Sequence, residues 1–272
     1  MAYQKLKEAN ENFAFQEFKK DADKGHRICQ LQVAMMYENG IGTEKNLKKA
    51  FEYYEKAANQ GCAISQNALG CMYREGTGTA KNPEKALEYF QKSADQGNAG
   101  AQCNLGNMYR TGTGTAKNLE KALEYFQKSA DQGHDIAQNN LGNMYRTGTG
   151  TAKNLEKAFE YYEKAADQGN AGAQYNLGNM YRTGTGTAKN LEKALEYFQK
   201  AADQGHIHSR IEIQKLSESK SAIPSVIQIS ENSVAIQIQQ PIQPIAVKRP
   251  FILNVSESSA FSSAKKQTIQ IE

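Results

Sequence analysis

Long apolar runs and a surplus of charge of one sign are both missing from this chain of 272 residues. No apolar segment approaches the roughly 20 residues that a membrane-spanning helix needs, and the opening MAYQKLKEANENF contains no apolar stretch of the kind that directs secretion. The net charge is only +4, with both signs interleaved, so no strong field for nucleic acid or an anionic membrane arises. These absences predict a soluble cytoplasmic protein that binds neither membrane nor nucleic acid.

Cysteine and tryptophan are also scarce. The chain has no tryptophan and four cysteines, Cys29, Cys62, Cys71 and Cys103, which follow no regular pairing. In a chain without a secretory signal, unmatched thiols are expected to stay reduced. We therefore interpret the cysteines as incidental and expect no disulfide framework.

What the chain has instead is a repeat of 36 residues. Its closing glycines are Gly25, Gly61, Gly97, Gly133, Gly169 and Gly205. The segment 98–133 returns almost unchanged at 134–169 and 170–205, and in altered form at 62–97 and 26–61. A fixed period of this length is typical of solenoids, in which each unit buries its apolar face only against its neighbours. The repeat therefore predicts a binding surface and offers no chemistry.

The first half of each repeat predicts an amphipathic helix. Ala101, Leu105 and Tyr109 lie at i, i+4 and i+8, which places one apolar stripe on a helix. Gly106 lies inside this helix, where glycine costs up to about 1 kcal/mol against alanine. Because the glycine recurs at 70, 142 and 178, we expect a close approach between helix backbones at this position.

The second half predicts another helix after a glycine-rich loop. The loop TGTGTAK, residues 111–117, supplies glycines for turns that need a positive φ. Asn118 and its equivalents are placed to cap the free N–H groups of the second helix. Leu119, Ala122 and Phe126 then continue the apolar stripe, and Gly133 ends the helix.

The ends of the array differ from its centre. Residues 1–25 contain one helix without its partner, and this half-repeat covers the front of the five repeats at 26–205. Residues 206–218 continue the pattern weakly and predict a degenerate capping helix. From 219 to 272 serine, glutamine, isoleucine and proline dominate, which predicts a disordered low-complexity tail. Residues 226–239 alternate apolar and polar side chains, so a marginal hairpin is the alternative there.

These residues resemble the Sel1-like repeat, a relative of the tetratricopeptide repeat. The matching positions in one repeat are Ala101, Leu105, Gly106, Met108, Tyr109, Gly112, Gly114, Lys121, Ala122, Tyr125, Phe126, Ala130 and Gly133. Tyrosine replaces the tryptophan that is common in the family, and the cysteine pairs of its cysteine-rich bacterial members are absent. The resemblance implies an all-α, right-handed α/α superhelix that assembles other proteins.

No pattern in the chain predicts catalysis, a cofactor or a metal site. The G-T-G loops follow a helix rather than a strand, so turn geometry explains them better than phosphate binding. The histidines, His26, His134, His206 and His208, are interpreted as polar turn residues, since the pair His206 and His208 has no obvious third ligand. We find no nucleophile and base that a rigid element would hold together. We therefore expect no enzyme and no small-molecule substrate.

The face opposite the apolar stripe of the first helices is the predicted binding surface, by analogy with tetratricopeptide arrays. It repeats as rows of Arg74, Arg110, Arg146 and Arg182; of Asn104, Asn140 and Asn176; and of Asn107, Asn143 and Asn179, with Cys103 and Tyr175 at a variable position. Arginine favours carboxylate-bearing ligands through charge-assisted hydrogen bonds. Recent duplication would copy a solvated face equally well, so it remains an alternative explanation of the rows.

The function we predict is a scaffold or adaptor that grips a segment of a partner protein. One alternative is a hydrolase, such as the β-lactamase activity of cysteine-rich relatives, and the missing cysteine pairs count against it. The other is a nucleic-acid-binding solenoid, and the nearly neutral repeats count against that.

Overall fold

The computed structural model describes residues 2–221, with the side chains of residues 6–218. Within these residues the chain forms twelve α-helices and no strand. Their bounds are α1 Ala2–Asp23, α2 Arg27–Asn39, α3 Leu47–Asn59, α4 Ala63–Glu75, α5 Pro83–Asp95, α6 Ala99–Thr111, α7 Leu119–Asp131, α8 Asp135–Thr147, α9 Leu155–Asp167, α10 Ala171–Thr183, α11 Leu191–Asp203 and α12 Ile207–Ser221. The all-α prediction is confirmed for this part of the chain. The tail beyond Ser221, with the alternative hairpin at 226–239, lies outside the described residues.

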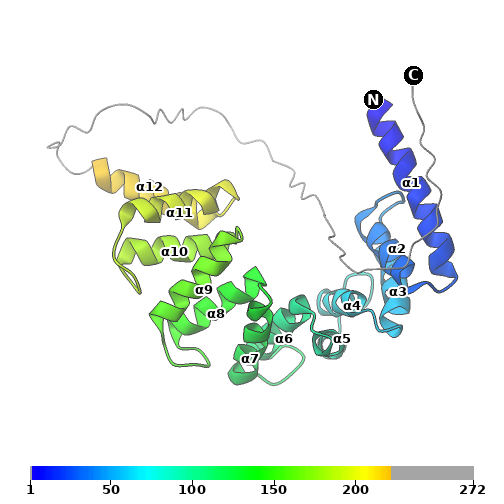
Figure 1. Ribbon diagram of the computed structural model, residues 1–272, viewed down its shortest axis with the longest axis horizontal. Coiled ribbons are helices and arrows are strands. Elements are labelled where there is room, and N and C mark those ends of the chain that lie inside the picture. Colours follow the sequence, from blue (N-terminus) through cyan, green and yellow to red (C-terminus); the bar gives the residue numbers. More distant parts are fainter. Residues whose placement is uncertain (1, 222–272) are drawn as a thin grey trace, which may run out of the picture. The chain divides into compact units, whose positions relative to one another are not determined.

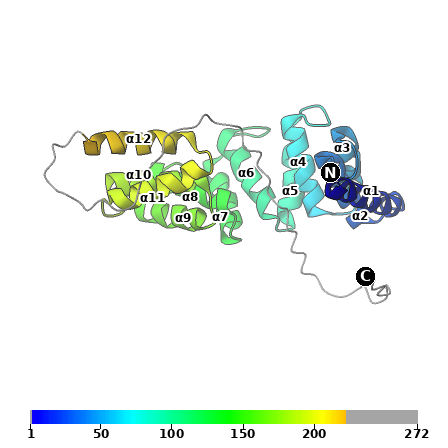
Figure 2. The same cartoon turned by 90° about the horizontal axis from the view of Figure 1, so that it is seen from above.

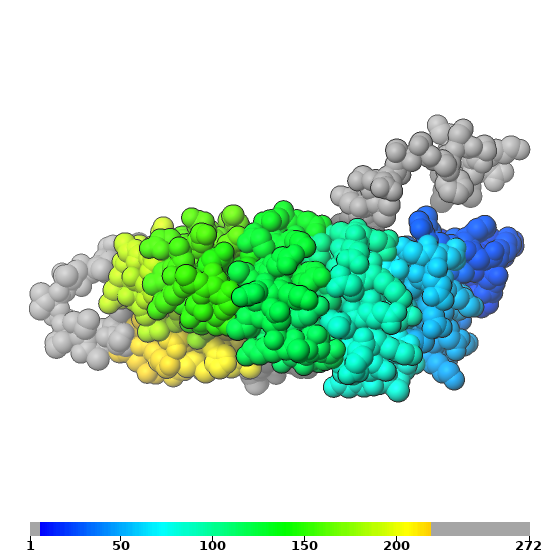
Figure 3. All heavy atoms as spheres, turned by 90° about the horizontal axis from the view of Figure 1, so that it is seen from below, coloured from blue at the N-terminus to red at the C-terminus, as the bar shows by residue number. Residues whose placement is uncertain are grey.

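The helices form a series of pairs. In each repeat the first helix (α2, α4, α6, α8 or α10) packs against the second (α3, α5, α7, α9 or α11), which also contacts the first helix of the next repeat. Figures 1 and 2 show the pairs following one another, with α1 against α2 at the front and α12 against α11 at the back. In the space-filling view the successive repeats form bands that lie against one another (Figure 3). This is the stacked arrangement of a solenoid.

Helix ends are fixed where the sequence predicts. Oδ1 of Asn118 accepts a hydrogen bond of 2.9 Å from the backbone N–H of Lys121, and the equivalent asparagines cap the other second helices. Each first helix of the described repeats ends at a left-handed glycine, such as Gly112 with φ +77°. Gly114, with φ +68°, lies so close to the preceding repeat that a Cβ atom would be 2.5 Å from the carbonyl oxygen of Pro83. The loop glycines therefore set both turn and spacing.

The glycine inside each first helix faces an aromatic ring rather than another backbone. A Cβ atom on Gly106 would lie 2.7 Å from Cδ1 of Phe126, whose ring is fully buried. The same contact recurs between Gly70 and Phe90, Gly142 and Tyr162, and Gly178 and Phe198. The expected close approach exists, but its partner was predicted wrongly. The ring packs where a side chain would stand, and this packing offsets the roughly 1 kcal/mol that glycine costs in a helix.

Two contacts of a buried glutamine were not predicted from the sequence, one to the preceding repeat and one within its own repeat. The buried Gln102 donates to the carbonyl of Ala94 at 3.4 Å, and its own Oε1 accepts from Gln132 at 2.7 Å. Equivalent glutamines make the same pair of bonds in the other four repeats. A buried amide is costly unless it is satisfied. The bond to Ala94 therefore holds one repeat on the preceding one, and the bond to Gln132 fixes the glutamine that makes it.

Lysine side chains of the second helices are held against stacked tyrosines. The rings of Tyr109 and Tyr125 stack with centroids 5.7 Å apart, and Nζ of Lys121 and of Lys128 lies 5.2 and 5.4 Å from these centroids. The same stack, with two lysines, recurs in the other four repeats. Cation–π contact thus ties much of the positive charge to the fold. No helix within residues 2–221 is long and apolar enough to cross a bilayer.

Candidate functional site

The predicted binding residues lie on the first helices of four consecutive repeats, α4, α6, α8 and α10. Their asparagines are half-buried, and their arginines are half-buried or exposed. Cys103 is different, because only 4% of it is exposed. Burial also raises the pKa of its thiol to about 12, so it is neither a surface contact nor a reactive group. Its inclusion in the predicted surface was wrong.

Each asparagine of the row Asn107, Asn143 and Asn179 orients an arginine of its own helix. Nδ2 of Asn107 donates to the carbonyl of Cys103 at 3.3 Å, which fixes the amide, and its Oδ1 accepts from Nη2 of Arg110 at 3.0 Å. The same arrangement joins Asn143 to Arg146 and Asn179 to Arg182. The arginines of the three central and C-terminal repeats are therefore held in place before any ligand arrives.

Asparagines of the row Asn104, Asn140 and Asn176 join neighbouring repeats. Nδ2 of Asn104 donates to Oδ1 of Asn67 at 3.1 Å, and Nδ2 of Asn176 donates to Oδ1 of Asn139 at 3.0 Å. The amide groups of Asn104 and Asn176 thus form hydrogen bonds within the protein, so part of the row has a structural role. Their contribution to a partner is correspondingly smaller than that of the arginines.

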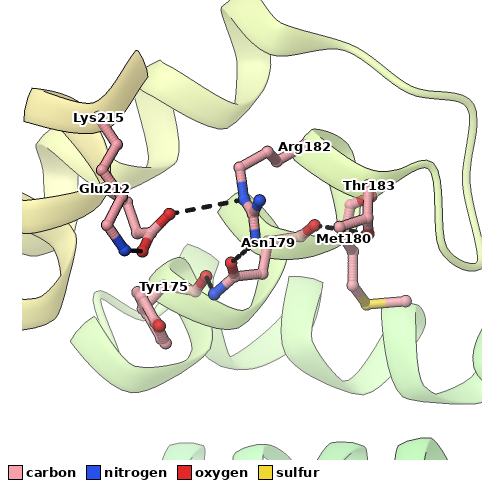
Figure 4. Close-up of polar contacts among 7 residues, drawn as sticks. All are labelled: Tyr175, Asn179, Met180, Arg182, Thr183, Glu212 and Lys215. Carbon is pink, nitrogen blue, oxygen red and sulfur yellow. Dashed lines mark hydrogen bonds and ion pairs between the residues drawn. The ribbon is translucent and has the colours of Figure 1, made fainter. Parts of the chain in front are cut away.

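The two outer arginines are paired with glutamates. Nη2 of Arg74 lies 2.9 Å from Oε1 of Glu75, and its Nη1 donates to Oδ1 of Asn104 at 2.7 Å. At the other end, Nε of Arg182 lies 3.7 Å from Oε2 of Glu212, which α12 supplies (Figure 4). Lys215 in turn holds the same carboxylate at 2.8 Å. Both outer arginines thus have a carboxylate partner within this chain, although Glu212 is shared between Arg182 and Lys215.

The two inner arginines have no such partner within the described residues. Arg110 bonds only to the neutral amide of Asn107. Nε of Arg146 donates to the hydroxyl of Tyr162 at 3.1 Å, and its Nη2 donates to Asn143. A guanidinium has five N–H donors, so each of these side chains keeps donors for a ligand. Charge that is free for binding is therefore concentrated in the two inner positions.

A pocket of about 470 Å³ opens beside Arg110, between α6 and α8. It is lined by Arg110, Lys117, Leu119, Asn140, Asn143, Met144, Thr147 and Thr149. Three of these residues belong to the predicted rows, and two are cations. Lys117 was not predicted as a binding residue, although the lysine recurs at the same place in every G-T-G loop. Two cations with amides and hydroxyls around an apolar floor suit an anionic side chain.

Tyr175 is turned toward the back of the array instead. Its ring centroid lies 4.8 Å from that of His206 and 5.8 Å from that of Phe198. The tyrosine helps to seat the turn before α12, so packing accounts for it without a ligand.

The comparison with protein families follows the helix pairs just described. The family model of the Sel1 repeat matches residues 28–62, 63–98, 99–134, 135–170 and 171–206. The chain belongs to the Sel1-repeat family. Sel1-repeat proteins are in general scaffolds for protein interactions. No curated protein matches the chain.

Solved Sel1-repeat structures share this fold. The c5321 protein, a protective antigen of uropathogenic Escherichia coli strains with an SLR fold, is 34% identical over 77% of this chain, with a TM-score of 0.67. This chain spans 45% of that protein's length. A Sel1 repeat protein of Oxalobacter formigenes is also 34% identical, with a TM-score of 0.65 over 68% of this chain and 76% of that one.

Proposed function

We propose that this Sel1-repeat chain is a scaffold that binds an acidic segment of a partner protein over its central repeats, at Arg110 and Arg146. The observation that carries the proposal is the distribution of charge along the arginine row. Glu75 and Glu212 form ion pairs with the outer arginines, whereas no carboxylate of the described residues pairs with the inner two. An acidic segment that spans two repeats would satisfy both inner guanidinium groups.

The preorganised arginines make such binding favourable. A hydrogen bond to a charged group contributes about 1.5–3 kcal/mol, and less side-chain entropy is lost when the donor is already held. The amide oxygens of Asn107 and Asn143 accept hydrogen bonds from the two arginines and so orient their guanidinium groups. The contact between Arg182 and Glu212 is an internal example of the chemistry we propose for the partner's carboxylates.

The proposal includes no catalytic step. The residues that line the pocket are two cations, amides, hydroxyls and apolar groups, and they bring no base next to a nucleophile. An ionised phosphate would also fit two cations, so nucleic acid is the competing ligand that the experiment must separate from protein.

The test compares inner with outer arginines. The full chain is titrated, with fluorescence anisotropy as the readout, against a labelled peptide rich in glutamate and against the same peptide with glutamine in place of every glutamate. The binding variant carries Arg110→Gln and Arg146→Gln, and its matched control carries Arg74→Gln and Arg182→Gln. Circular dichroism first establishes that both variants keep their helices.

We expect the inner variant to bind the glutamate peptide at least 10-fold more weakly, which corresponds to about 1.4 kcal/mol, and the control to change little. Equal affinity for the glutamine peptide, or equal loss in both variants, would overturn the proposal. Tighter binding of a single-stranded oligonucleotide than of the glutamate peptide, lost in the inner variant, would replace the protein ligand by nucleic acid. Capture from a native lysate with the same two variants then identifies the partner.

A further inference from the structure

Three potential metal ligands meet at the turn between α1 and α2. An oxygen of Asp21, a ring nitrogen of His26 and Sγ of Cys29 all lie within 4.8 Å of one another. Nδ1 of His26 is 4.0 Å from Oδ1 of Asp21. The backbone N–H of His26 donates to the carbonyl of Asp21 at 3.1 Å, so the turn itself brings these side chains together.

The same turn recurs at the five later junctions with other residues. The position of Asp21 is taken by Ala57, Ser93, Ser129, Ala165 and Ala201; that of His26 by Cys62, Asn98, His134, Asn170 and His206; and that of Cys29 by Ser65, Ala101, Ala137, Ala173 and Ser209. Only the first junction combines three residues that bind metals. At the later junctions the positions of Asp21 and Cys29 hold only alanine or serine, the small side chains that packing at this turn requires.

His26 also differs from three of its equivalents, because its side chain does not cap the following helix. Asn98, His134 and Asn170 each accept a hydrogen bond from the backbone N–H of the third residue on, and so cap the following helix. The side chain of His26 makes no such bond and is mostly exposed. Cys29 is half-buried, whereas Ser65 and Ala101 are fully buried. At the front of the array the three side chains are therefore open to an ion.

We propose that Asp21, His26 and Cys29 bind a zinc ion that ties the end of α1 to the start of α2. Zinc takes nitrogen, sulfur and carboxylate oxygen at about 2.0–2.3 Å in a tetrahedral arrangement. Its ligand atoms then lie roughly 3.3–3.8 Å apart, so the side chains close by about 1 Å on binding. Water takes the fourth position, and the thiol releases its proton to solvent. Nζ of Lys24, now 2.8 Å from Oδ1 of Asp21, gives way to the metal.

Cobalt reports the site directly, because a cobalt–thiolate bond absorbs in the near ultraviolet and tetrahedral cobalt absorbs in the visible. The full chain is titrated with Co²⁺ under reducing conditions, and Zn²⁺ is then added. A variant with Cys62→Asn, Cys71→Asn and Cys103→Ala leaves Cys29 as its single thiol. We expect this variant to bind one Co²⁺ with the thiolate band, and Zn²⁺ to displace it and to raise the unfolding temperature.

Ligand variants are chosen from residues that the chain itself carries at this turn. Asp21→Ser, His26→Asn and Cys29→Ala reproduce Ser93, Asn98 and Ala101, so the fold should be kept. Each should weaken Co²⁺ binding more than 100-fold, since even changes in residues that only support a ligand cost about 10–100-fold. His134→Asn, at the equivalent turn, should leave affinity unchanged. The proposal is overturned if saturating Co²⁺ gives no thiolate band, or if His26→Asn and Asp21→Ser bind as the parent does.

Discussion

Replacing Gly106 by alanine tests whether the aromatic ring of the second helix is the reason for the glycine in the first. The added Cβ would lie 2.7 Å from two ring carbons of Phe126, a separation at which something must shift. The ring is 0% exposed and is surrounded by the core, so it has little room to move. We therefore expect an unfavourable steric effect to oppose the gain in helix propensity.

Gly100 supplies the matched control, because it lies in the same helix without a ring against it. A Cβ there would meet its first neighbour, Oδ1 of Asn98, only at 3.4 Å, and the equivalent position carries Ile64 and Ile136. Gly100→Ala should stabilise by up to about 1 kcal/mol. Gly106→Ala gains a similar amount from propensity and loses about 1–3 kcal/mol to overpacking. The propensity effect cancels in the comparison.

The difference between the two variants should therefore be about 1–3 kcal/mol, with Gly106→Ala the less stable. Ala34 occupies this position in the first repeat opposite the buried Tyr54, so a small adjustment is possible and favours the lower half of that range. Urea unfolding followed by circular dichroism measures both variants. If Gly106→Ala proves as stabilising as Gly100→Ala, the ring contact does not explain the glycine.

Two further predictions concern the turns. Gly133 has φ +84° and nothing lies within 4 Å of an added Cβ, so Gly133→Ala should lower the free energy of unfolding by about 1–2 kcal/mol through the left-handed backbone alone. Gly114→Ala should lower it further, because the added Cβ also meets a backbone carbonyl. Equal unfolding midpoints for the two variants would contradict the spacing role of Gly114. Burial lowers the pKa of His134 below its ordinary 6.5, so the unfolded chain binds the proton more readily. The stability that the neutral ring contributes is fully present above pH 6.5 and is lost as the pH falls below 6.5 and through the lower pKa of the folded state. His134→Asn should therefore flatten the loss of stability on acidification, and unchanged midpoints across the same pH range would refute this.

The sequence predicted the helices well, because each signal in it is local and recurs. The asparagine caps and the loop glycines act within a few residues of their own positions, so period and residue type were enough to place them. Contacts between distant residues were harder. The pairing of Gln102 with Gln132 and the stacking of Tyr109 on Tyr125 join residues 30 and 16 positions apart. Such pairs depend on how the two helices cross, which a pattern on one helix does not specify.

The candidate site was predicted in outline and not in detail. The rows of Arg110 and Asn107 follow from helical spacing, but the burial of Cys103 depends on packing against α7 and α8. Lys117 was missed because its loop brings it to the pocket from outside the helix. Glu212 was missed because a degenerate repeat hides its equivalence to Asn176.

The acidic residues at the ends of the arginine row bear on whether duplication alone explains it. Copying one repeat would give every arginine the same surroundings. Instead, three glutamates depart from the repeat, and each lies at an end of the row. Glu38 stands where the other repeats have arginine, Glu75 where the three repeats after it have threonine such as Thr111, and Glu212 where the three repeats before it have asparagine such as Asn176. Glu75 and Glu212 each pair with the nearest arginine, and Glu38 accepts a hydrogen bond from Tyr54. Changes that place a carboxylate at both ends of the row and none at the centre are expected if the centre is where an acidic ligand binds.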